Sequence, residues 1–363
     1  MKKILSLLAS ASLILTSAVG CNTAAGSDDK LSIITTIFPE YDWVTEILGD
    51  KADDAEITML MQSGADMHNY QPSAEELIKV SDCDMFIYVG GESDEWVHDA
   101  LENATNKDMT VITLLDVLGD DIVKEEEIVE GMEHEHEHEE EEHEEEEHEE
   151  EEHEDEEHEE EHEEEEHEDE EHEEEHEEEH EHEADEHVWL SLKNSKIICQ
   201  HIADKLCEID PDNKSVYEKN VSDYIGKLDE LDKEYQQMVD SSAVKTLVFA
   251  DRFPFRYLTE DYGLDYYAAF SGCSAETEAS FETVTFLAEK VNELGLTTVL
   301  TIESGDGKIA ETVIESTANP TGRLILDSMQ SVTMSDIESG ADYLSAMRGN
   351  LGVLKEALEN KIG

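Results

Sequence analysis

Basic residues are scarce in this chain. Only 23 of its 363 residues are Lys or Arg, against 97 Asp and Glu, and the formal net charge at pH 7 is −74. Setting aside the 38 acids of the single most acidic stretch still leaves a charge of about −36. Because so acidic a surface repels phosphates and attracts cations, we expect no nucleic acid partner and favour a cationic one.

Cysteine is also sparse. Beyond Cys21, the chain has four cysteines, and their spacing is wide and irregular: Cys83, Cys199, Cys207 and Cys273. This spacing excludes a zinc knuckle or a small disulfide scaffold. Cys199 and Cys207 lie in a stretch with helical apolar periodicity, so we expect both thiols to be buried.

Long apolar segments are absent except at the start. Two lysines precede an apolar run from Ile4 to Val19, which is typical of a secretory signal. The sequence Ser17-Ala18-Val19-Gly20-Cys21 resembles a bacterial lipobox, which predicts a signal peptide over residues 1–20, a lipid on Cys21, a tether over 21–29 and an extracytoplasmic protein anchored to the cell membrane. Ordinary cleavage that leaves an unmodified cysteine is the alternative. No later segment is long and apolar enough to span a bilayer.

The most distinctive stretch is residues 133–183, which contain only Glu, His and two Asp. Such a composition cannot form a hydrophobic core, and it displays imidazoles at short intervals. Imidazole and carboxylate ligands suit zinc, so we interpret the stretch as a low-affinity collector of metal ions. A solvated acidic spacer is the alternative. The thirteen histidines are His134, His136, His138, His143, His148, His153, His158, His162, His167, His172, His176, His180 and His182.

Three pairs of these histidines formally match the H-E-x-x-H pattern of zinc hydrolases. That pattern is functional when both histidines lie on a stable helix with a poised glutamate base and a third ligand. In residues 133–183, neighbouring glutamates at helical spacing repel one another, which disfavours a packed helix. We therefore expect no enzymatic activity.

Outside this run, short apolar strands alternate with helices, and the remaining residues suffice for two domains of modest size. Strands are expected at 33–38, 55–61, 85–89, 111–115, 246–250, 264–270, 298–302 and 324–326. Helices are expected at 41–48, 73–80, 193–208, 255–262, 281–294, 308–316 and 339–361, with a longer one opening at Asp210-Pro211. The pattern predicts an α/β fold of two lobes, each a mostly parallel sheet flanked by helices, joined by one long rigid helix.

Several local motifs occur in a characteristic order. They are Gly64-Ala65-Asp66-Met67-His68-Asn69-Tyr70-Gln71-Pro72-Ser73, Asp185-Glu186-His187-Val188-Trp189-Leu190, Tyr262-Gly263-Leu264 and Tyr343-Leu344-Ser345-Ala346-Met347-Arg348-Gly349-Asn350-Leu351. In this respect the mature chain resembles the zinc- and manganese-binding receptor lipoproteins of bacterial ABC importers. The resemblance implies one metal ion in a cleft between two lobes, with two ligands from each lobe, and an insert just before the second histidine motif in zinc-type members.

The resemblance implies four metal ligands and places three of them directly: His68 is the first, His187 the second and Asp327 the fourth. The third position of the family falls on Arg252, a permanent cation that cannot bind a metal. Asp251 is the first replacement we consider, followed by Glu303 and then Cys273, since open α/β sheets present ligands beyond the carboxyl ends of their strands. In a rival arrangement Arg252 pairs with Asp327 or Glu303, and the metal has two histidines plus carboxylate or water.

These observations predict a monomeric receptor that captures Zn²⁺ and delivers it to an ABC permease. Two histidines with carboxylates also suit Mn²⁺ or ferrous iron, and the histidine-rich run makes zinc the favoured ion. A surface zinc-buffering or adhesion lipoprotein without a permease is a further alternative. The predicted boundaries are 30–132 with 184–209 for the N-terminal lobe, 210–242 for the linking helix and 243–363 for the C-terminal lobe.

Overall fold

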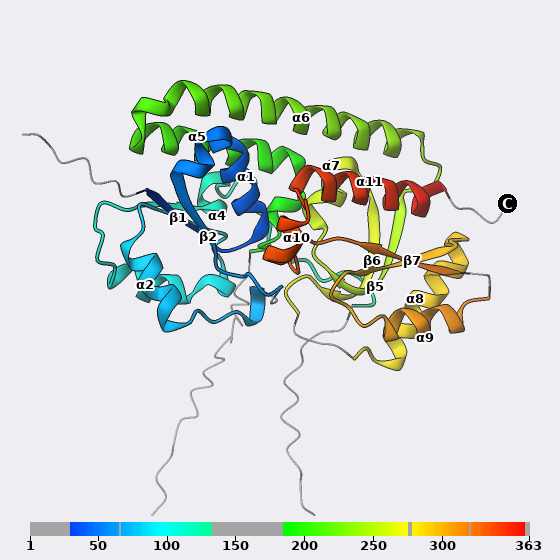
Figure 1. Ribbon diagram of the computed structural model, residues 1–363. Coiled ribbons are helices and arrows are strands. Elements are labelled where there is room, and N and C mark those ends of the chain that lie inside the picture. The colour runs from blue at the N-terminus through cyan, green and yellow to red at the C-terminus, as the bar shows by residue number, and fades with distance from the viewer. Residues whose placement is uncertain (1–29, 65–66, 133–183, 275–277, 319–320, 360–363) are drawn as a thin grey trace, which may run out of the picture.

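Figure 1 shows the computed structural model of the chain, which describes residues 30–64, 67–132, 184–274, 278–318 and 321–359. The predictions for the signal peptide, the tether, Cys21 and the histidine-rich insert lie outside these residues. Among the helices described, none combines the length and the apolar composition needed to cross a membrane.

The N-terminal lobe is built on a four-stranded parallel sheet. Its strands are β1 (Leu31–Thr35), β2 (Ala55–Met59), β3 (Met85–Tyr88) and β4 (Thr110–Thr113), hydrogen-bonded in the order β2-β1-β3-β4. Its helices and 3₁₀ turns are α1 (Phe38–Leu48), η1 (Gly49–Asp54), η2 (Met67–Asn69), α2 (Ala74–Asp82), η3 (Glu92–Asp94), α3 (Trp96–Glu102), α4 (Leu114–Leu118), η4 (Val188–Leu190) and α5 (Leu192–Ile209). The central strands are short apolar runs because helices cover both faces of a parallel sheet.

The C-terminal lobe repeats this architecture. Its strands are β5 (Thr246–Phe253), β6 (Asp265–Ser271), β7 (Thr298–Ile302) and β8 (Gly322–Leu326), all parallel, in the order β6-β5-β7-β8. Its helices are α7 (Arg256–Tyr262), α8 (Phe281–Leu294), α9 (Lys308–Ser316), α10 (Met334–Glu338) and α11 (Tyr343–Glu359). The predicted fold class, two parallel α/β lobes, is confirmed.

One long helix, α6 (Lys214–Ser241), follows the short turn η5 (Pro211–Asn213) and lies across both lobes (Figure 1). Its buried face repeats at helical spacing: Tyr217, Val221, Tyr224, Leu228, Leu231, Tyr235, Met238 and Val239. Asn220 Nδ2 donates to the Ile47 carbonyl of α1 at 3.0 Å, and Tyr235 Oη donates to the Met347 carbonyl of α11 at 2.6 Å. The helix therefore contacts both lobes. The exact lobe boundaries stay a prediction.

The start of the chain differs in detail from the expectation. The strand predicted over residues 33–38 ends at Thr35, and α1 begins at Phe38. Pro39 lies in the first helical turn, where a missing amide hydrogen costs nothing. The Glu40 carboxylate accepts hydrogen bonds from the amides of Thr36 and Ile37 at 2.7 and 3.2 Å, which caps the helix.

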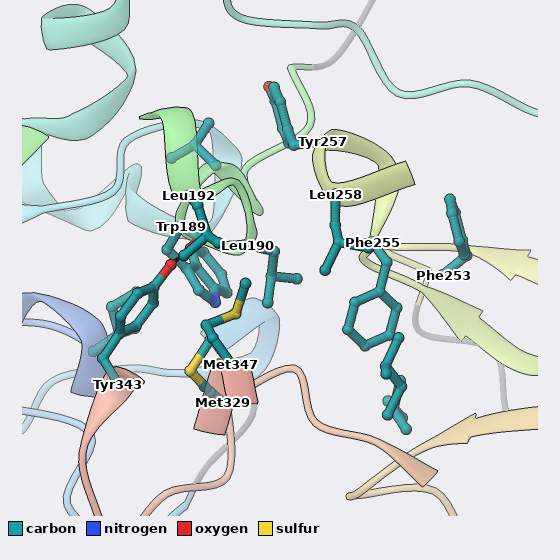
Figure 2. Close-up of a cluster of buried hydrophobic side chains, with 14 of the residues drawn as sticks. Trp189, Leu190, Leu192, Phe253, Phe255, Tyr257, Leu258, Met329, Tyr343 and Met347 are labelled. Atoms are coloured by element: carbon teal, nitrogen blue, oxygen red, sulfur yellow. Dashed lines mark hydrogen bonds between the residues drawn. The ribbon is translucent and has the colours of Figure 1, made fainter. Parts of the chain in front are cut away.

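A shared apolar core joins the two lobes beside the second histidine motif. Figure 2 shows Trp189 and Leu190 next to Met329, Met347 and Tyr343. The indole nitrogen of Trp189 donates to the Ser328 carbonyl at 2.9 Å, and Tyr343 Oη donates to the Trp189 carbonyl at 2.6 Å. Because buried polar groups are costly without partners, these bonds fix the segment that carries His187.

Candidate metal site

His68 is presented by η2, in the loop that follows β2. Its ring is nearly buried, with 9% of the side chain exposed. Its Nδ1 lies 2.8 Å from Ser93 Oγ, and its Nε2 lies 3.3 Å from Nε2 of His187. The two predicted histidines, which are 119 residues apart in sequence, thus present the same nitrogen to a common point.

His187 is completely buried just before η4. The Asp185 carboxylate accepts hydrogen bonds from the backbone amide and from Nδ1 of His187, both at 2.9 Å. A carboxylate on one ring nitrogen fixes the orientation of the imidazole and makes the other nitrogen a better metal ligand. Nε2 is the nitrogen that this arrangement directs toward His68.

Cys273 lies beside the two histidines. Among the described residues, there is one group of buried or partly buried side chains that could share a metal ion: His68, His187 and Cys273. Each offers one ligand atom, and the three atoms lie within 4.8 Å of one another. Gly272 makes the approach possible, because a Cβ at this position would meet the His187 Cε1 at 2.9 Å and the Phe253 carbonyl at 3.0 Å. Burial, reinforced by the negative charges of Glu126, Glu186 and Asp185, raises the pKa of the Cys273 thiol.

Glu186 is a buried acid in contact with the first histidine. Ser93 donates to its two oxygens through its amide, at 2.9 Å, and its hydroxyl, at 2.5 Å. Oε2 lies 3.5 Å from His68 Nδ1. Burial raises the pKa of Glu186 to about 7, although the bonds from Ser93 oppose the shift. Asp185, Glu186 and Ser93 were not predicted to have a role; the first two adjoin His187 in the sequence, but nothing in the sequence connects Ser93 to them.

Asp251 belongs to β5, and its carboxylate is directed toward β7. The pairing of β5 with β6 is irregular between Phe249 and Arg252. Asp251 accepts hydrogen bonds from the amides of Arg252, at 2.9 Å, and Ile302, at 3.3 Å, and burial raises its pKa. It is not part of the group of His68, His187 and Cys273. Its metal-binding role stays a prediction.

Asp327 follows β8, as the resemblance implies, with its backbone held by the Asn350 side chain through two bonds of 2.8 Å. Its carboxylate accepts from the Met329 amide at 2.8 Å, and burial, with the charge of Glu303, raises its pKa to about 6. Glu303 accepts hydrogen bonds from Ser328 and Ser331. Neither acid belongs to the histidine group, and their roles as ligands remain predictions.

Arg252 reaches toward the Cys273 segment, since its Nη1 donates to the Ser274 carbonyl at 3.5 Å. The rival pairing of Arg252 with Asp327 or Glu303 stays a prediction. A separate group of His98, Asp99 and Glu102 is exposed on α3, and exposed groups of this kind are common without a metal.

The sequence matches the family described as "Zinc-uptake complex component A periplasmic" over residues 33–357. It is 30% identical to the zinc-binding lipoprotein AdcA of Streptococcus pneumoniae over 99% of this chain, which spans 62% of that relative's length. It is 27% identical to the high-affinity zinc uptake system protein ZnuA of Bacillus subtilis, over 96% of this chain and 95% of the relative.

The fold also matches a crystal structure, that of the Zn(II)-bound ZnuA-like domain of Streptococcus pneumoniae AdcA. The TM-score is 0.63 with 26% sequence identity, and the match covers 91% of this chain and 100% of that domain.

Proposed function

Because this chain belongs to the family described as "Zinc-uptake complex component A periplasmic", we propose that it captures zinc outside the cytoplasm and delivers it to the permease of an ABC importer. The family resemblance inferred from the sequence motifs is confirmed. The observation that carries the proposal is the approach of His68 Nε2 and His187 Nε2 to 3.3 Å, each ring held by its own hydrogen bond.

The side chains around this point favour a transported ion over a chemical reaction. Both imidazoles are held by neighbours through Nδ1, from Ser93 and Asp185, and both present Nε2. A metallohydrolase needs a base beside an open metal position and a substrate cleft. We assign the buried acids Asp185 and Glu186 to orienting the imidazoles, which fits the family of uptake components.

Zinc is the ion we propose. Two imidazoles suit zinc well, whereas manganese prefers oxygen ligands. The named relatives described above are zinc-binding or zinc-uptake proteins. We further propose that the chain is a monomer. We also propose that it is tethered to membrane lipid through Cys21, because a receptor must stay beside its permease.

Metal titration tests the proposal. The chain with Cys21→Ser, which prevents lipidation, is titrated with zinc by calorimetry in competition with a chelator. We expect one tight site above the weaker sites of residues 133–183. His68→Ala removes a ligand, so it should lower the affinity of the tight site by on the order of 100-fold, because the loss of a supporting neighbour alone costs up to about that much.

His98→Ala is the matched control, because His98 is an exposed histidine of α3 in the same lobe. It should leave the tight site unchanged. Absence of a tight zinc site in the parent chain, or tighter binding of manganese than of zinc, would contradict the proposal.

A further inference from the structure

We propose that the sulfur of Cys273 is the third protein ligand of the zinc site, so that the ion is bound by two imidazoles and one thiolate. This assignment deepens the proposed function and rests on it. It makes the C-terminal lobe contribute its ligand from the end of β6 instead of the end of β5.

The spacing of the ligand atoms fits one ion. Zinc binds imidazole nitrogen at about 2.0–2.1 Å and thiolate sulfur at about 2.3 Å, so two ligand atoms on one tetrahedral zinc lie roughly 3.3–3.6 Å apart. The two Nε2 atoms are 3.3 Å apart. The Cys273 sulfur lies within 4.8 Å of one ring nitrogen of each histidine, so a single ion can reach all three side chains once the sulfur moves to the bonding distance.

The backbone holds Cys273 in this place. β6 ends at Ser271, which pairs with Phe253 at the end of β5, so Cys273 lies at the carboxyl edge of the sheet where such sites form. The Cys273 amide donates to Glu126 Oε1 at 2.7 Å, from the segment that precedes residues 133–183. The bond from Arg252 to the Ser274 carbonyl holds the next residue.

The alternative ligand on β5 is directed elsewhere. The irregularity between Phe249 and Arg252 places Asp251 where its carboxylate accepts from the Ile302 amide of β7. Arg252, at the position implied by the family, carries a cation that cannot bind zinc. In our assignment Arg252 is a positioning residue, because its side chain supports the loop that carries the sulfur.

A thiolate ligand also determines which ions the site accepts. Sulfur favours zinc and other thiophilic ions over manganese, which prefers oxygen. The exclusion of manganese would therefore depend on Cys273 as well as on the two histidines.

Cobalt is a suitable probe, because a thiolate bound to Co²⁺ gives a sulfur-to-metal charge-transfer absorption that imidazole and carboxylate ligands do not give. Cobalt bound to the thirteen histidines of residues 133–183 would not give this absorption, since that stretch contains no cysteine. We expect the absorption in the Cys21→Ser chain and its loss in the same chain carrying Cys273→Ser. Zinc affinity should fall by on the order of 100-fold in Cys273→Ser.

Two further variants make the test decisive. Cys207→Ser is the matched control, because Cys207, which was expected to be buried, is a partly exposed thiol of α5 away from this group. This variant should keep both the absorption and the zinc affinity. Cys273→His supplies a nitrogen ligand in place of sulfur, so it should recover part of the zinc affinity without the absorption. Circular dichroism of the metal-free variants checks that each is folded.

The proposal is overturned if zinc binds tightly and depends on His68 while Cys273→Ser leaves its affinity unchanged and the parent chain shows no charge-transfer absorption. That result would leave the zinc receptor intact and return the third position to Asp251 or Glu303. A parent chain without any tight zinc site would instead overturn the proposed function itself.

Discussion

At the scale of single residues, the site depends on how closely backbone and imidazole approach each other. Gly272 lies against the His187 ring and the Phe253 carbonyl, and a Cβ there would be within about 3 Å of both. Contacts this short force a neighbour to move. The absence of a side chain at residue 272 is therefore a requirement of the site.

Gly272→Ala should consequently weaken zinc binding and destabilise the metal-free protein by about 1–3 kcal/mol, as overpacking does in well-packed interiors. Gly349→Ala is the matched control, because this helical glycine of α11 has nothing within 4 Å of a built Cβ. It should be neutral or stabilising by up to about 1 kcal/mol. Chemical denaturation and zinc titration of both variants make the comparison; equal effects at the two glycines would refute the steric explanation.

The residues of the site differ in how far the sequence predicts them. His68 and His187 are predictable because each stands in a distinctive local motif, and the structure brings them together. Cys273 ranks low from sequence because its position depends on the irregular pairing of β5 and on Gly272, which are tertiary features. Ser93 is not predictable at all, since its bonds to His68 and Glu186 cross between separate segments.

At the scale of elements, Asp42 of α1 lies at the junction of three helices. Its carboxylate accepts from the Tyr343 amide of α11 at 3.2 Å and from the Tyr224 hydroxyl of α6 at 3.3 Å. Burial raises the pKa of Asp42 to about 7, and the nearby charges of Glu46 and Asp342 add to the shift. The folded protein therefore binds a proton here that the unfolded chain releases near pH 4.

A raised carboxyl pKa makes the metal-free protein lose stability as the pH rises from about 4 to about 7, because only the unfolded chain ionises in that range. Asp42→Asn keeps a hydrogen-bond acceptor but cannot ionise. The free energy of unfolding of the variant should equal that of the parent chain near pH 4 and be larger by about 2 kcal/mol at pH 8. This value is the pKa shift of Asp42 converted to free energy and discounted for partial exposure. Urea denaturation with a chelator present measures this difference; a difference that does not change with pH would contradict the assignment.

Three elements of the C-terminal lobe were predicted with the correct limits. Helices α8 and α9 and strand β7 have the expected limits, because each carries a clear period and a defined start. The short helices α3 and α10, of seven and five residues, were not expected as separate elements. Segments of this length carry too few periodic positions, so their conformation is determined by the packing around them.

At the scale of the whole molecule, the two lobes are connected by more than the long helix. Tyr257 of the C-terminal lobe donates to the Asp185 carbonyl at 2.8 Å and accepts from the Lys124 amide at 3.0 Å. These contacts place the segments that flank residues 133–183 beside the metal site. If residues 133–183 collect ions as predicted, those ions are released close to the histidines.

Replacing residues 133–183 with a short Gly/Ser linker should leave the zinc affinity of the site and the melting temperature of the metal-free protein unchanged. Capture of zinc should become slower when zinc is scarce, because the local concentration of cations falls. Stopped-flow measurement of zinc uptake tests this. The matched control is a full-length chain with the thirteen histidines changed to glutamine, since it keeps the negative charge and loses the imidazoles. A lower zinc affinity of the histidine site in either variant would contradict the collector role.

The flanks of the insert meet in a short antiparallel pairing of Glu125 with Ala184, next to the bond of 2.7 Å from the Asp185 amide to the Lys124 carbonyl. Once a loop is closed at its base, the entropic cost of more residues rises only with the logarithm of its length. Doubling the 51 residues costs about 0.6 kcal/mol. The Glu/His tract is therefore free to expand or contract by repeat slippage during evolution, with the two lobes unaffected.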